Sequence, residues 1–399
     1  MNISNIYIIT VFKNILNDNI IHSFINFIVS VNDDKDLNDN LKLYSDFVYK
    51  LYKADKNANL YNYIKRLLQT DCNVLSVNYK DIMESDFIFK SAIFELNVFD
   101  ELIKYDYKTI KSILLDKYPN SKNIIENLPM FNCNYNQPFD IYELINSYRN
   151  NGWGIFVYNK AFQYTSKKEI IPVEHFKAMT FKDLKNYEYQ QAVILRNTKA
   201  FVEGKEANNI LLYGDRGCGK SSTVKALINE FESYNLKIIQ ITKESFIYLS
   251  DLYDKLRTLP NKFIIFADDI SFEENDKEFS TIKAVLEGSL SDKPENTIIY
   301  ATTNRMHLVK ESYTSREGSE LHINDTIDET VSLSDRFGIM LTFSSLTKTE
   351  YLDIVKQIAQ DLDIQINDKL YRKAEMFAAL KAIRTPRVAR QFITDYINE

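Results

Sequence analysis

The stretch NNILLYGDRGCGKSST, residues 208–223, decides the fold, because it holds three glycines within six positions in a chain that has only 9. It fits the pattern G-x-x-x-x-G-K-[ST], in which an apolar strand leads into a glycine-rich loop and then a helix. A loop that wraps a polyphosphate must point backbone N–H groups inward, and glycine permits the dihedral angles and close approach required. The helix that follows adds its N-terminal dipole. The stretch therefore predicts a nucleoside triphosphate site.

The side chains of this loop have separate expected roles. Lys220 carries the charge that reaches the outer phosphates, and the Ser221 hydroxyl ligates Mg²⁺. The alternative for the whole loop is a glycine-rich turn that binds nothing. Cys218 is either an oxidisable thiol or a small residue that fills a variable position of the motif. The residues expected to bind the phosphates of this nucleotide are Gly214, Asp215, Arg216, Gly217, Cys218, Gly219, Lys220, Ser221 and Ser222.

Five short apolar runs, one directly before the glycine-rich loop and four after it, are separated by helical stretches. Such spacing indicates a parallel sheet covered on both faces. Beyond Ser345 only helical patterns remain. The runs occupy residues 209–213, 236–242, 262–267, 297–302 and 339–343.

Two aspartates follow the third run, in KFIIFADDISFEE at 262–274. Asp268 is expected to hold Mg²⁺, directly or through water. Asp269 is expected to be the base that orients the attacking water, although Glu273 or Glu274 could share or take this role. The alternative is that the aspartates cap a helix.

Three later polar residues complete the candidate site. Asn304 ends the fourth run in TIIYATTNR and can position the water, with Thr302 and Thr303 as weaker candidates. Arg336 precedes the last run in SLSDRFGIM, and Arg387 lies in RTPRVARQF, one turn before Arg390. The spacing of these arginines also suits surface positions on a helix.

The chain before the sheet has a different character, since no glycine precedes Gly152 and no proline precedes Pro119. Apolar residues recur there at three- and four-residue spacing, which predicts helices with one buried face. We expect a mainly helical domain at 1–150, a linker with a short hairpin at 151–180, a nucleotide-binding domain at 181–344 and a helical lid at 345–399.

Composition limits the remaining classes of function. The 399 residues are 45% hydrophobic, which predicts folded domains. The net charge of -6 gives no overall indication of a nucleic-acid or membrane surface. The three cysteines form no CxxC pair, which argues against a disulfide framework or a zinc site and favours the cytoplasm. We expect no signal peptide, and no stretch reaches the roughly 18 uninterrupted apolar residues of a membrane helix.

The order of these motifs resembles that of the AAA+ ATPases. More narrowly, WGIFVYNKAFQY, VEHFKAMTFKDLKNYEYQ, the glycine-rich loop and RTPRVARQF resemble a bacterial family of predicted AAA+ ATP-binding proteins of uncharacterised role. The match covers about residues 150–399. It implies an α/β fold with a five-stranded parallel sheet of order 5-1-4-3-2 and a small helical lid.

The resemblance also implies roles for single residues. Asn304 becomes sensor 1, Arg387 becomes sensor 2, and Arg336 becomes an arginine finger acting on the ATP of a neighbouring subunit in a homo-oligomeric ring, such as a hexamer. An arginine supplied by a neighbour stabilises charge that develops in phosphoryl transfer. The residues expected nearest adenine are Leu184, Lys185 and Asn186.

Two departures from AAA+ patterns affect the expected function. Most members have aspartate then glutamate where this chain has Asp268 and Asp269, so hydrolysis is expected to be less efficient. The stretch KESFIYLSDLYDKL, 243–256, lacks the aromatic-apolar-glycine loop of unfoldases, which argues against polypeptide threading.

The sequence thus favours a Mg²⁺-dependent ATPase whose helical domain recruits an unidentified protein or nucleic-acid target away from membranes. A nucleotide-dependent switch, loader or scaffold with little basal hydrolysis is the alternative. A small-molecule kinase fits the loop, but it does not fit Asn304, Arg336, Arg387 and the lid.

Overall fold

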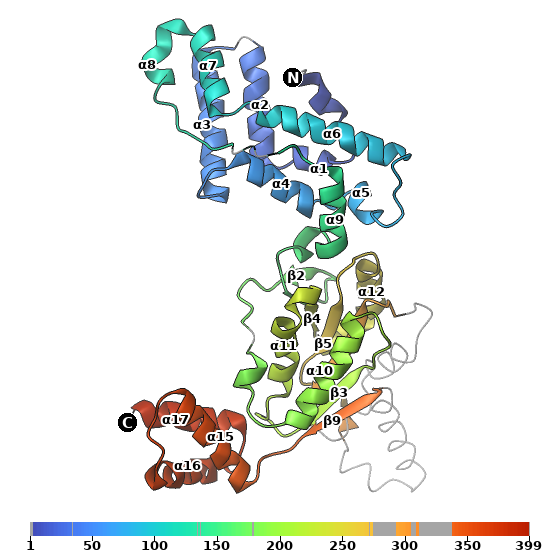
Figure 1. The fold of residues 1–399 in the computed structure, drawn as a ribbon, viewed down its shortest axis with the longest axis vertical. Helices are drawn as coiled ribbons and strands as arrows, with labels where there is room; N and C mark the ends of the chain where they lie inside the picture. Colours follow the sequence, from blue (N-terminus) through green and yellow to red (C-terminus); the bar gives the residue numbers. More distant parts are fainter. Residues whose placement is uncertain are drawn as a thin grey trace. The chain divides into compact units, whose positions relative to one another are not determined.

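The computed structural model describes residues 3–33, 35–133, 135, 137–177, 179–270, 272–273, 293–304, 309–310 and 337–398. The chain divides into two compact units, Met1–Tyr158 and Asn159–Glu399. Each unit is described by itself below, and both are drawn in Figure 1. Among the described residues, no helix has both the length and the apolar character needed to cross a membrane.

The first unit is helical, which confirms the expectation for this region. Acidic and amide side chains begin its helices: Asp18, for example, accepts hydrogen bonds from the backbone N–H groups of Ile20 and Ile21 at the start of α2. Aromatic side chains fill the space between α2 and α3, where the Phe24 and Phe47 rings lie 4.5 Å apart. Its elements are η1 (Ile3–Ile8), α1 (Lys13–Leu16), α2 (Asn19–Asn32), α3 (Leu37–Ala54), α4 (Leu60–Thr70), α5 (Val74–Val77), α6 (Phe87–Ile103), α7 (Tyr107–Lys117), η2 (Pro119–Ser121), α8 (Lys122–Ile125), α9 (Ile141–Asn151) and η3 (Gly154–Phe156).

The second unit is built on a seven-stranded sheet of order β2-β1-β4-β5-β7-β3-β9. Strands β3, β4, β5, β7 and β9 are the five predicted runs, so their order is 5-1-4-3-2, as predicted, and all their pairings are parallel. The strands of the sheet are β1 (Ala161–Tyr164), β2 (Ile170–Pro172), β3 (Ile210–Gly214), β4 (Lys237–Ile241), β5 (Phe263–Ala267), β7 (Thr297–Thr303) and β9 (Ile339–Phe343).

The sheet has two more strands than the five expected, because the hairpin placed in the linker joins it. Strand β1 pairs in parallel with β4, and β2 pairs antiparallel with β1. Burial explains the difference, since Ala161, Phe162 and Tyr164 are all at most 4% exposed. Nothing in the residues of the hairpin indicates which sheet edge it covers.

Helices cover the sheet and form a separate bundle at the C-terminus (Figure 1). Side chains of α10 and α11 form one apolar core with those of the strands. The lid, α15 to α17, has its own core around Tyr351 and Phe392. The remaining elements are η4 (Phe181–Asp183), α10 (Glu188–Val202), α11 (Lys220–Glu230), η5 (Glu232–Tyr234), η6 (Lys243–Tyr248), α12 (Leu249–Arg257), β6 (Phe272–Glu273), β8 (Val309–Lys310), α15 (Lys348–Asp361), α16 (Asp368–Lys381) and α17 (Pro386–Asn398), of which β6 and β8 pair in parallel.

Candidate nucleotide site

The glycine-rich loop joins β3 to α11 at the carboxyl edge of the sheet. Three of its residues, Gly214, Gly217 and Gly219, have φ angles of 129°, 83° and 90°, a region that side chains rarely adopt. A Cβ on Gly214 would lie 2.2 Å from the carbonyl oxygen of Phe343 in β9. Gly214 is therefore required both by the backbone angle and by the close approach of the neighbouring strand.

We expect Gly214→Ala to destabilise the second unit by about 3 kcal/mol, because strain at a positive φ adds to overpacking against β9. Urea unfolding measures this change. Gly204→Ala is the matched control: Gly204 also has a positive φ of 75°, but a Cβ there would meet nothing within 4 Å. Equal losses for the two variants would contradict the role of the Phe343 contact.

Lys220 opens α11 and turns back onto the loop. Its ammonium donates to the carbonyl oxygens of Gly214 at 2.7 Å and Asp215 at 2.8 Å, and to Oδ1 of Asn304 at 3.0 Å. The residue is only 6% exposed, and burial lowers the pKa of the ammonium below its usual value. A buried cation held by neutral acceptors is suited to receive an anion.

Asp268 lies just after β5, and three side chains converge on its carboxylate. Both the Ser221 hydroxyl and the Thr302 hydroxyl donate to Oδ1, the latter at 2.7 Å. The ammonium of Lys225 lies 3.7 Å from Oδ2. The hydroxyl and carboxylate oxygens expected to bind Mg²⁺ are thus in direct contact.

Asp269 is held in a left-handed conformation, with φ of 53°. Its backbone N–H donates to the Thr302 hydroxyl at 2.8 Å, and its carboxylate accepts a hydrogen bond from the Asn304 amide. Thr302, which sequence reasoning ranked below Asn304, therefore orients both aspartates. A continuous chain of hydrogen bonds runs from Lys220 through Asn304 to Asp269.

Arg387 reaches the same place from the lid. Its residue lines a cavity of about 330 Å³ together with the loop, both aspartates, Thr302 and Asn304. Its backbone N–H donates to the carbonyl oxygen of Gly217 at 3.3 Å. Arg336 and Glu274 lie outside the described residues, and for Glu273 only the backbone is described, in β6.

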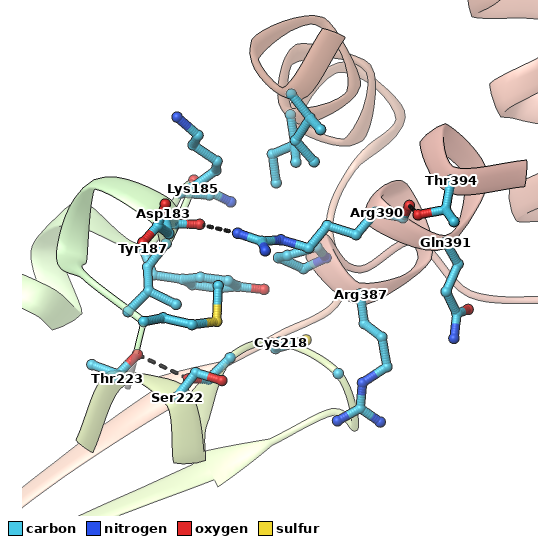
Figure 2. Close-up of a pocket in the computed structure, with 18 of the residues that line it drawn as sticks. Asp183, Lys185, Tyr187, Cys218, Ser222, Thr223, Arg387, Arg390, Gln391 and Thr394 are labelled. Carbon is cyan, nitrogen blue, oxygen red and sulfur yellow. Dashed lines mark hydrogen bonds between the residues drawn. The ribbon is translucent and has the colours of Figure 1, made fainter. Parts of the chain in front are cut away.

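A second cavity, of about 640 Å³, adjoins the loop and lies between η4, α10 and the lid (Figure 2). Leu184, Lys185 and Asn186, the residues expected near adenine, all line it. The amide of Gln191 donates to the carbonyl oxygens of Leu184 at 3.1 Å and Asn186 at 2.8 Å. Lys185 extends to the lid, where its ammonium lies 2.9 Å from a carboxylate oxygen of Asp361.

Two further residues, to which the sequence assigned no separate role, shape this cavity. Tyr187 lies against Phe343, with ring centroids 4.8 Å apart, and its hydroxyl donates to the carbonyl oxygen of Ser344 at 2.6 Å. Arg390, for which the sequence left a surface position open, donates to the carbonyl oxygen of Asp183, and Figure 2 shows it crossing from α17. Tyr187 could be noted in the sequence KNYEYQ, but its partner Phe343 lies more than 150 residues away, so the contact could not be predicted.

Cys218 is enclosed within the loop. It is 1% exposed, its thiol lies 3.5 Å from the carbonyl oxygen of Ser344, and burial raises the pKa of the thiol. A buried thiol of raised pKa is poorly reactive. This environment favours the reading of Cys218 as a small residue that fills its position.

Comparison with known families assigns the second unit. The family described as "Protein of unknown function (DUF815)" matches residues 157–399, which is more than half of the chain. The chain belongs to this family. Its strand order is that of the AAA+ fold, with the glycine-rich loop after the first strand of that order. A search among curated proteins found no match.

Solved structures give distant matches. A variant of RuvB from Thermotoga maritima is 20% identical with a TM-score of 0.35, and the match covers 53% of this chain and 61% of that one. The Orc1 protein of Aeropyrum pernix, solved in complex with DNA, is 17% identical with a TM-score of 0.36, covering 52% and 58%. This chain therefore spans less than two thirds of either structure.

Proposed function

We propose that this protein is an AAA+ ATPase that binds ATP with Mg²⁺ and hydrolyses it to drive conformational change or assembly on a target recruited by residues 1–150. The observation that carries the proposal is the convergence of Lys220, Asp268, Asp269 and Asn304 around one cavity next to the glycine-rich loop. A structural loop would have no need of two carboxylates and a buried ammonium at one sheet edge.

The residues present fit both ligands. The three acceptors that the buried Lys220 ammonium binds are all neutral, so triphosphate oxygens would give it charged hydrogen-bond partners. Ser221 and Asp268 offer the hard oxygen ligands that Mg²⁺ prefers. Bound Mg²⁺ would neutralise charge on the phosphate oxygens. The cavity lined by Leu184, Lys185 and Asn186 has room for the base and ribose.

Four side chains of the chain would have separate roles in hydrolysis. Asp269 would accept a proton from the attacking water, and Asn304 would orient that water through its amide. Arg387, whose residue lines the phosphate cavity from the lid, would bind the outer phosphates and stabilise their developing charge. Thr302 would keep both aspartates in position.

Hydrolysis per protomer, measured against protein concentration with Lys220→Ala as the blank, tests this function. A rate that rises steeply with concentration would support an assembled ring whose sites are completed by a neighbour. ATP binding without any rate above the blank would instead favour a switch that hydrolyses ATP only with its partner. Absence of ATP binding would refute both.

For Arg336→Ala we expect retained ATP binding with hydrolysis lowered about 1,000-fold, the lower end of the effect of an arginine finger. Mixing this variant with Lys220→Ala, which keeps Arg336 but lacks its own site, should restore part of the hydrolysis. Such rescue supports action across a subunit interface. Undiminished hydrolysis by Arg336→Ala alone would refute the assignment.

A nucleotide-dependent switch is the second candidate, and a specific observation favours it. The carboxylate of Asp269, one methylene shorter than glutamate, is already bound by Asn304, and its backbone angle is fixed at a positive φ. A base held in this way has little freedom to approach water. Its low basal turnover would suit a loader or scaffold acting on a protein or nucleic acid.

A further inference from the structure

Residues around the nucleotide site bind residues 343–345, which are the end of β9 and the start of the chain that leads to the lid and are called the connector below. The backbone N–H of Asp215 donates to the carbonyl oxygen of Phe343 at 2.9 Å, and the backbone N–H of Ser345 donates to Oδ2 of Asp215 at 2.7 Å. The Tyr187 hydroxyl donates to the carbonyl oxygen of Ser344. The connector is therefore fixed residue by residue at the point where the lid leaves the sheet.

The side chain of Asp215 contacts this connector. Residues 216–222 all line the phosphate cavity, whereas Asp215 lines neither that cavity nor the larger one. Its carboxylate accepts from the lid connector, while its carbonyl oxygen accepts from Lys220. One residue thus links the phosphate-binding ammonium to the start of the lid.

Binding of a phosphate would change the hydrogen bonds that join Lys220 to Asp215. An ammonium has three N–H donors, and here each has one acceptor: Gly214, Asp215 and Asn304. A phosphate oxygen that binds Lys220 must displace at least one of these acceptors. Two of the three are carbonyl oxygens of the segment that holds the connector, so phosphate binding alters what holds Asp215.

We propose that Asp215 couples occupancy of the phosphate site to the position of the lid, through its hydrogen bond to the backbone of Ser345. The proposal rests on the proposed nucleotide binding and deepens it. A second contact completes the path, because Gly217 accepts from the backbone of Arg387 and a Cβ on Gly217 would lie 3.0 Å from the Thr385 hydroxyl. The loop therefore contacts the connector at Ser345 and the lid itself at the start of α17.

The test measures the distance between the sheet and the lid in the full chain. The exposed residues Lys199 on α10 and Lys369 on α16 are replaced by cysteines that carry spin labels. Cys72→Ser and Cys133→Ser remove two native cysteines that could also be labelled. Mg²⁺ with a non-hydrolysable ATP analogue is the probe, and its binding is titrated separately by calorimetry. We compare the unmodified Asp215 with Asp215→Ala and with Asp215→Asn, which keeps an acceptor oxygen.

The analogue should shift the label distance in the parent protein and in Asp215→Asn, since both have an acceptor for the Ser345 N–H. Asp215→Ala should still bind the analogue but lose the shift, with the ratio of the two lid positions changed about tenfold, as for one hydrogen bond to a charged group. An undiminished shift in Asp215→Ala overturns the proposal, as does binding without any shift in the parent protein. If the parent protein does not bind the analogue, the proposed nucleotide-binding function itself is refuted.

A second variant keeps the test decisive where Asp215→Ala fails to fold. Tyr187→Phe removes only the hydroxyl that binds Ser344 and retains the ring against Phe343. Its ligand-induced shift should be smaller than that of the parent protein. A shift equal to that of the parent would show that the hydrogen bonds to the connector do not transmit the ligand's effect.

Discussion

Replacing Lys220 with alanine is expected to weaken ATP binding about 100-fold, because removing one partner of a buried, hydrogen-bonded charge pair costs about 3 kcal/mol. The ammonium lies within 3.0 Å of three acceptors and is buried among them, and residues 214–222 hold no second lysine that could replace it. Titration with a fluorescent ATP analogue in the presence of Mg²⁺ measures the loss.

Lys199→Ala is the matched control for this variant. Lys199 is exposed on α10 and belongs to neither cavity, so its removal takes away the same charge without touching the site. Thermal unfolding of both variants shows whether the loop still folds. Equal affinities for the Lys220 and Lys199 variants would contradict the phosphate assignment and leave the glycine-rich loop as a structural turn.

Replacing Asp269 with asparagine is expected to leave ATP affinity unchanged and to lower turnover about 100- to 10,000-fold, the usual contribution of a general base. Asparagine has the same shape and keeps an oxygen that can accept from the Asn304 amide, so the hydrogen bond at this point is preserved. Only proton acceptance is lost. Single-turnover hydrolysis separates this effect from product release.

Glu273→Gln decides between the two candidate bases. If Asp269 is the base, this variant should hydrolyse ATP at the parent rate, since Glu273 lies in β6 and not at the end of β5. Loss of turnover in Glu273→Gln with a normal rate in Asp269→Asn would transfer the role to Glu273. Parent rates in both variants would refute both base assignments.

Local patterns were enough to predict the sheet and the loop. The adjacent sequence was sufficient for the loop, because the roles of Gly214 and Lys220 follow from the motif itself. The strand order was implied by the resemblance to the AAA+ ATPases and not by the apolar runs. The contacts that close the larger cavity could not be predicted in this way. Arg390 meets Asp183 across 207 residues of chain, and only the folded lid brings them together.

The same limit explains Asp215. In the sequence it occupies a variable position of a phosphate-binding motif, and nothing nearby indicates a partner at Ser345, 130 residues later. Thr302 was visible at the end of its apolar run, but its two contacts with Asp268 and Asp269 depend on how β5 and β7 align. Register, which sequence patterns leave open, decides such contacts.

The pairing of β1 with β4 has a practical consequence for dividing this chain. A fragment that begins at residue 181 would contain every nucleotide-binding motif but would lack β1 and β2. The backbone N–H and carbonyl groups along one side of β4 would then be uncovered, and an exposed apolar edge strand recruits other chains. Such a fragment would aggregate for a reason unrelated to ATP, whereas one beginning at Asn159 would keep its natural edge.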